Sequence, residues 1–174
     1  MRRWPAAIVR GAMSDPFVDD LIALLPRLRR YAISLSRSRD VADDLVQTAC
    51  ERALAKREQF DPGTRLDAWV MRILRNLWID MARQNKARGP TVDVDDAYYL
   101  VGDDGGVVTD QRLRLAETAK AIGSLSDEYR EVLMLICVDD LSYREAAEVL
   151  GVPMGTVTSR LARARAKLDA MLEE

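Results

Sequence analysis

The stretch Leu141–Leu168, LSYREAAEVLGVPMGTVTSRLARARAKL, has the pattern of two short helices joined at one glycine. Ser142 and Glu145 fit a capping box, in which each side chain accepts a hydrogen bond from the other residue's backbone amide. Gly151 suits the left-handed turn that ends a helix, and Pro153 is favoured where the next helix starts. This order of signals predicts a helix-turn-helix.

The second of these helices has an apolar face and an opposite face of short, polar and basic side chains. At about 100° per residue, one face gathers Val157, Leu161, Ala164 and Leu168. The other carries Ser159, Ala162, Arg163 and Ala166, with Thr158 at its edge, Arg160 and Lys167 on one flank and Arg165 on the other. Short side chains allow close approach to a major groove, an arginine reaches base edges, and flanking cations bind phosphates. The pattern favours a DNA-reading helix over a solvated helix that happens to be basic.

The composition argues against several classes of protein. The 174 residues are 48% apolar and 31% charged, which is ordinary for a globular protein. No apolar run approaches the roughly 20 residues that span a bilayer. Histidine, the commonest general base and metal ligand, is absent. With no glycine-rich phosphate loop and no nucleophile beside a base, we expect no enzyme activity, no catalytic residues, no metal site and no cofactor.

Two cysteines, Cys50 and Cys137, each lie within an apolar helical pattern. We therefore expect both to be buried free thiols. Free thiols fit a reducing compartment.

Apolar residues at helical spacing predict an N-terminal helical unit as well. The predicted elements are a helix over Phe17–Leu35 with Pro26 at a kink or a new start, a helix from an N-cap at Asp40 to Lys56, a turn over Phe60–Thr64, and a helix over Arg65–Gln84. On the last helix we expect an inward face of Leu66, Trp69, Val70, Ile73, Leu77 and Met81, and an opposite strip of Arg72, Arg75, Ile79, Arg83 and Lys86. Trp78 and Met71 fall at one border of this strip, and Asn76 and Asp80 at the other. A basic strip with an aromatic residue beside it suits unstacked nucleic acid, and the alternative is a solvated face with packing tryptophans.

Charge is distributed unevenly despite a net charge of −2. Residues 91–110 contain six aspartates and no lysine or arginine, with glycines nearby, which is typical of an exposed, poorly ordered linker. We therefore predict an all-α fold of two small helical domains, residues 13–88 and 111–174, joined by a flexible acidic linker at 89–110. Patterned sequence begins after Met13, which we hypothesise to be the native start, so residues 1–12 are expected to be a disordered extension without the features of a signal peptide.

Three runs of sequence together resemble the extracytoplasmic-function (ECF, group IV) sigma factors of the sigma-70 family. They are DVADDLVQTACERAL, FDPGTRLDAWVMRILRNLWIDMARQNKAR, and LSDEYREVLMLICVDD followed by the helix-turn-helix. The resemblance covers about residues 17–88 and 111–172. It implies that 13–88 is sigma region 2, that 111–174 is sigma region 4, and that the chain is an alternative sigma factor. Such a protein binds core RNA polymerase, reads −35 and −10 elements and assists DNA melting.

The resemblance also implies residue roles. Contacts with the β′ clamp helices of the polymerase fall on Asp44, Gln47, Glu51 and Arg52. Recognition of the −10 element is assigned to Phe60, Thr64, Arg65, Arg72, Arg75, Asn76, Ile79 and Arg83. In this assignment the 60–66 loop and Asn76 hold a flipped base. Arg72, Arg75 and Arg83 contact the backbone of the melted strand. Recognition of the −35 element is assigned to Thr156, Thr158, Ser159, Arg160, Ala162, Arg163, Arg165 and Lys167. Thr158 and Ala162 depart from the longer side chains common in the family, which shifts base readout toward Arg163 and DNA shape.

The implied partners are core RNA polymerase (β′ clamp helices and β flap), promoter DNA and an anti-sigma factor, in a cytoplasmic stress response without membrane insertion. Two other readings compete. A sigma-like decoy that captures an anti-sigma factor is expected to lose the basic strips, which this chain keeps. A stand-alone helix-turn-helix repressor leaves the pattern of residues 40–88 unexplained.

Overall fold

The computed structural model describes residues 15–88 and 110–173, and within these ranges every regular element is a helix. The all-α prediction is therefore confirmed. The predicted extension at 1–12 and the linker at 89–109 lie outside the described residues. No helix in the described part of the chain is both long and apolar enough to span a membrane.

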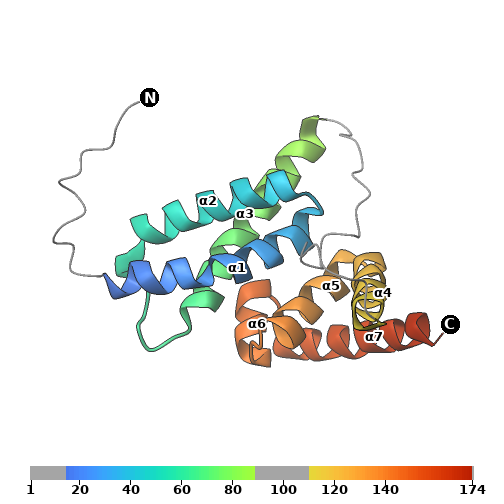
Figure 1. The fold of residues 1–174 in the computed structure, drawn as a ribbon. Coiled ribbons are helices and arrows are strands. Elements are labelled where there is room, and N and C mark those ends of the chain that lie inside the picture. Colours follow the sequence, from blue (N-terminus) through green and yellow to red (C-terminus); the bar gives the residue numbers. More distant parts are fainter. Residues whose placement is uncertain (1–14, 89–109, 174) are drawn as a thin grey trace.

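The N-terminal unit packs α1 (Pro16–Ser36), α2 (Arg39–Ala55) and α3 (Leu66–Arg88) against one another (Figure 1). The side chain of Asp15 caps α1 by accepting a hydrogen bond from the Phe17 amide at 3.1 Å. Pro26 neither breaks nor restarts α1. It lies on the exposed side, where water can satisfy the carbonyl that its missing amide leaves without a donor.

The start of α2 differs from its prediction. Ser38, not Asp40, is the N-cap, and its hydroxyl accepts from the Val41 amide at 3.4 Å. Arg37 ends α1 in a left-handed conformation (φ 55°), which leaves Ser38 extended and ready to cap the next helix. Both residue types are good caps, so the sequence pattern alone did not separate them.

The C-terminal unit contains α4 (Asp110–Ser124), α5 (Asp127–Leu133), a π-helical segment η4 (Met134–Val138), α6 (Tyr143–Leu150) and α7 (Met154–Leu172). The long helix α7 packs on α4, α5 and α6. The predicted capping box is present, with 2.7 Å from the Ser142 amide to Glu145 and 3.3 Å from the Glu145 amide to Ser142. Gly151 ends α6 at φ 64°. The helix-turn-helix prediction is confirmed.

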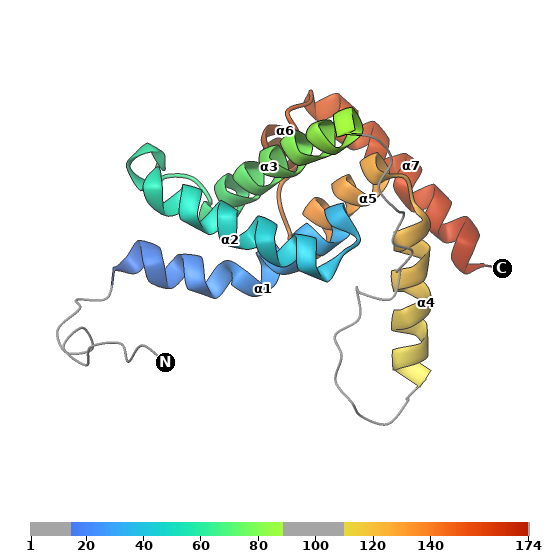
Figure 2. The same cartoon turned by 90° about the horizontal axis from the view of Figure 1, so that it is seen from above.

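The two units share one connected apolar core, in which α3 lies against α6 and α1 touches α5 (Figure 2). On α3, Met71 and Leu74 are both fully buried. The predicted inward face of α3 was incomplete, since it put Met71 at a border and omitted Leu74. Leu74 follows Val70 by four positions and precedes Leu77 by three, so helical spacing places it on the same face.

The prediction of two buried thiols is wrong for one cysteine. Both are free, but Cys50 is half-buried and Cys137 is exposed. Cys137 lies in η4, where the wider turn changes which way each side chain faces. Burial raises the pKa of the Cys50 thiol, with a smaller contribution from Glu51.

Candidate nucleic-acid interface

The outward face of α7 is built as its sequence predicts. Val157 and Ala164 are fully buried and Leu161 nearly so, which fixes the rotation of the helix. The opposite side chains are therefore exposed: Thr158, Ser159, Ala162, Arg163 and Ala166. The two hydroxyls donate to carbonyls of their own helix, from Thr158 to Met154 and from Ser159 to Thr156, each at 3.1 Å. Thr156 is half-buried at the edge of this face.

The cations flanking this face differ from Arg163 in their contacts. Arg160 pairs with Glu128 at 3.0 Å, and the Lys167 ammonium lies 5.7 Å from the centre of the Tyr129 ring. Arg165 reaches the Cys137 sulfur at 3.6 Å. Within the described residues Arg163 makes no hydrogen bond or ion pair. It stands at the middle of the exposed face and is available to a ligand.

A second polar face lies on α2. Asp44, Gln47, Glu51 and Arg52 are all exposed, opposite the buried residues of this helix. The Gln47 amide donates to Glu51 at 3.1 Å, which orders two of these side chains along the surface. The face is polar, continuous and accessible to a partner protein.

Between η2 (Arg57–Gln59) and α3, the loop is fastened by an aromatic cluster. The Phe60 ring lies 5.9 Å from that of Phe17 and 5.5 Å from that of Trp69. At the other end of the loop, Thr64 is exposed and its hydroxyl donates to the Asp61 carbonyl at 2.8 Å. Phe60 thus supports the loop from within, while Thr64 faces outward.

The basic strip of α3 is divided. Arg72, Asn76 and Arg83 are exposed, whereas Ile79 is half-buried. Arg75 is held by Glu131 of α5, with 2.6 Å between Nε and Oε1. The same Oε1 accepts from the Tyr31 hydroxyl at 3.0 Å. Tyr31 is fully buried, and burial followed by the Glu131 charge raises its pKa well above the ordinary value.

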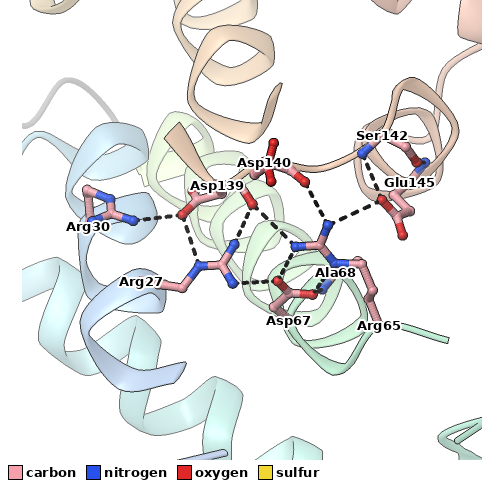
Figure 3. A network of polar contacts seen from close by, with 9 residues as sticks. All are labelled: Arg27, Arg30, Arg65, Asp67, Ala68, Asp139, Asp140, Ser142 and Glu145. Atoms are coloured by element: carbon pink, nitrogen blue, oxygen red, sulfur yellow. Dashed lines mark hydrogen bonds and ion pairs between the residues drawn. The ribbon is translucent and has the colours of Figure 1, made fainter. Parts of the chain in front are cut away.

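Ahead of α3, Arg65 joins a larger polar network between the two units (Figure 3). Its guanidinium pairs with Asp67 at 2.6 Å and donates to the Asp140 carbonyl at 2.6 Å. Burial alone raises the pKa of Asp67, but hydrogen bonds from Arg65 and the Ala68 amide bring it below the ordinary value. Arg65 and Arg75, both predicted to meet DNA, therefore have protein partners here.

Asp139, at the end of η4, is the acid at the centre of this network. Its carboxylate is fully buried, and Oδ1 lies 2.9 Å from Arg30 and 3.5 Å from Arg27. Arg27 also reaches Asp67 at 2.7 Å, so it links acids of both units. Neither Asp139 nor these two arginines was predicted from the sequence to be functional. Asp139 follows an apolar run and has the pattern of an ordinary helix end, and nothing local signals partners in α1.

Known protein families match both units. The family model of sigma-70 region 2 matches residues 21–88, and that of sigma-70 region 4 matches residues 115–168. The chain is 39% identical over 160 residues to the ECF RNA polymerase sigma factor EcfG of Rhodopseudomonas palustris, covering 92% of this chain and 87% of the relative.

Two solved structures share this fold. One is the sigma factor RpoE in complex with the anti-sigma factor NepR, from Bartonella quintana, with a TM-score of 0.75 and 34% identity over 90% of this chain and 96% of that one. The other is CnrH in complex with the cytosolic domain of CnrY, with a TM-score of 0.63 and 30% identity over 90% and 87% of the two chains.

Proposed function

The chain belongs to the sigma-70 family, in its ECF group, and on this premise we propose that it binds core RNA polymerase and directs initiation at promoters with a −35 and a −10 element. The observation that carries this function is the outward face of α7, where short side chains surround the unpaired Arg163. Sigma factors are specificity subunits, so the proposed role involves no catalytic residue. The proposed compartment is the cytoplasm, where the polymerase works.

The proposed −35 reader is α7. Arg163, with Thr158, Ser159 and Ala162, lies where base edges are read, and its fork of donors matches the two acceptors of guanine. Thr156, Arg160, Arg165 and Lys167 border this face and serve phosphates. The contacts of Arg160 with Glu128 and of Lys167 with Tyr129 also fix α7 against α5.

The proposed −10 reader is the loop after η2 together with α3. Asn76 and Thr64 are both exposed and serve the flipped base, whose extrusion costs a few kcal/mol. Arg72 and Arg83 follow the strand backbone, and Arg65, Arg75 and Ile79 join them once accessible. Phe60 acts by holding the loop, since its ring packs against those of Phe17 and Trp69.

The proposed partner surface for the β′ clamp helices is the exposed face of α2, at Asp44, Gln47, Glu51 and Arg52, and region 4 is the proposed partner of the β flap. We assign region 2 to residues 13–88, the linker to 89–110 and region 4 to 111–174. An anti-sigma factor is the proposed regulator, because a similar sigma factor was solved with such a protein bound.

Run-off transcription on fragmented host DNA tests the function directly. Core polymerase is assayed with and without the protein, and transcripts are mapped by sequencing. We expect new transcripts that begin at a fixed distance from a shared pair of sequence elements. No new transcript, with a core polymerase that is active with another sigma factor, would overturn the proposal in favour of a decoy that captures an anti-sigma factor.

A further inference from the structure

We propose that the start of α1 positions the −10 reader: Asp15 and Phe17 hold the 60–66 loop in place and thereby set how well the −10 bases are discriminated, without contacting DNA themselves. The inference rests on the proposed function, because it concerns the loop that is assigned to the flipped base. It deepens that function by adding two positioning residues from a helix that carries none of the residues assigned to the −10 element.

The tip of the loop is shaped by its own short-range hydrogen bonds. The Asp61 carbonyl accepts from the Thr64 amide at 2.9 Å and from the Thr64 hydroxyl at 2.8 Å. The Gly63 amide donates to the Asp61 carboxylate at 2.9 Å. These bonds join residues within the tip, so they fix the turn but not the direction in which Thr64 faces. That direction is set where the loop meets the rest of the unit.

The Phe17 ring contacts an aromatic residue at each end of the loop. Its centre lies 5.9 Å from that of Phe60, where the loop begins, and 6.4 Å from that of Trp69, in the first turn of α3. The Phe60 and Trp69 rings are 5.5 Å apart, so each of the three rings contacts the other two. Attractive aromatic pairs have centres about 4.5–7 Å apart. Phe17 therefore fastens both ends of the loop to the start of α1.

Asp15 supplies a second attachment through the two oxygens of one carboxylate. Its Oδ1 accepts from the Phe17 amide at 3.1 Å, and its Oδ2 pairs with Nη1 of Arg57 at 3.0 Å. The Arg57 carbonyl in turn accepts from the Phe60 amide at 3.1 Å. The same side chain thus caps α1 and holds η2, the short helix from which the loop leaves.

Both attachments lie at the surface of the unit. The side chains of the ion pair are 40% exposed for Asp15 and 56% for Arg57, and exposed pairs add little to global stability. The three rings are half-buried. Loss of either attachment is therefore expected to loosen the loop before it unfolds the domain. A loosened loop no longer holds Thr64 in one place, and a recognition site needs its groups held to within about 0.5 Å.

Limited trypsin digestion of the full chain tests the attachment without polymerase, because Arg57 and Arg65 flank the loop. Cleavage after these arginines is measured by mass spectrometry relative to cleavage inside α3. We expect local opening to raise it about tenfold in Phe17→Ala and about threefold in Asp15→Asn. Asparagine is also a good N-cap, so Asp15→Asn removes the ion pair and keeps the cap. Unchanged relative cleavage in both variants would overturn the proposal.

Two control variants lie on the same helix. Leu35→Ala removes a buried side chain from the last turn of α1, about 27 Å along the helix axis from Phe17. Asp20→Asn removes an exposed charge near the start of α1 that has no ion pair within the described residues. Neither is expected to change relative cleavage at the loop. A rise in Leu35→Ala equal to that in Phe17→Ala would show that general destabilisation, not the attachment, governs the loop.

Transcription by core polymerase with each variant tests the effect on selectivity. The promoter mapped by run-off transcription competes with copies that carry one changed base pair in the −10 or the −35 element. We expect −10 discrimination to fall about tenfold in Phe17→Ala and about threefold in Asp15→Asn, which is part of what one mismatched base pair costs. Discrimination at −35 should stay unchanged, whereas a general folding defect would lower transcription from every template alike. Phe17→Tyr keeps the ring and should keep −10 discrimination.

A loosened loop with normal −10 discrimination would refute the positioning role. Circular dichroism checks folding. If Phe17→Ala does not fold, Phe17→Leu, which removes the ring and keeps apolar bulk, and Asp15→Asn decide. Failure of run-off transcription would count against the proposed function and the selectivity role together. The digestion needs no polymerase, so it would still decide whether the start of α1 holds the loop.

Discussion

Two basic helices, α7 and α3, have similar sequence patterns and different surroundings. Both carry an arginine strip opposite an apolar stripe, and both were predicted to meet DNA. On α7 the central Arg163 is exposed and unpaired within the described residues, whereas on α3 Arg75 is bound to Glu131 at 2.6 Å. A row of arginines thus predicts a partner rich in oxygen acceptors, and a neighbouring domain supplies such acceptors as readily as a phosphate backbone does.

Among the arginines that have protein partners, the largest effect is expected from a substitution at their partner Asp67. It is 5% exposed and pairs with Arg65 at 2.6 Å and Arg27 at 2.7 Å. Asp67→Asn is expected to lower the free energy of unfolding by about 3 kcal/mol, the low end for a broken buried pair because both guanidiniums stay partly exposed. Urea unfolding at pH 7 measures the difference.

Acid should remove this effect. The pKa of Asp67 is below its ordinary 3.8 in the folded chain, so the folded state binds the proton less readily than the unfolded state. The carboxylate therefore stabilises the fold above about pH 3.8, and the stabilisation is lost as the pH falls through the folded-state pKa. The gap between the unchanged chain and Asp67→Asn should shrink on acidification. A gap independent of pH would mean that the substitution acts through packing instead of charge.

The exposed arginine of α7 is tested by substitution of Arg163. Arg163→Ala is expected to reduce discrimination between the correct and an altered −35 element by about 2 kcal/mol, because a bidentate base contact is lost. Arg165→Ala on the same helix is the control. It should weaken binding to both sequences about equally and lower the salt dependence, as for a phosphate contact. Competition binding with duplexes that carry the correct or the altered −35 element measures the effects of both substitutions. Unchanged discrimination in Arg163→Ala would rule out base reading by this residue.

Within α3, Asn76 is exposed while Arg75 beside it is occupied. Asn76→Ala is expected to slow promoter opening about tenfold, or about 1.4 kcal/mol in the activation free energy, and to leave polymerase binding unchanged. Gln84→Ala, also exposed on α3, should open promoters normally. Permanganate reactivity of unpaired thymines follows opening over time. Normal opening by Asn76→Ala would remove Asn76 from the flipped-base pocket.

The sequence predicted what depends on neighbours along the chain. The Ser142–Glu145 box, the turn at Gly151 and the buried stripe of α7 each involve residues a few positions apart, so their spacing carries the information. The contacts between the two units join residues far apart in the sequence: Tyr31 and Glu131 are separated by 100 positions, and Arg27 and Asp139 by 112. No periodicity within one helix encodes such a pair.

The smallest predicted effect compares two N-cap serines. The side chain of one accepts a hydrogen bond from its helix, and the side chain of the other does not. The Ser142 hydroxyl accepts from the Glu145 amide, whereas Ser126, the N-cap of α5, makes no such side-chain bond. Ser142→Ala is expected to cost about 1 kcal/mol of unfolding free energy and Ser126→Ala close to none. Urea unfolding of both variants checks this. Equal unfolding free energies for the two variants would show that the hydroxyl contact at the start of α6 adds nothing to stability.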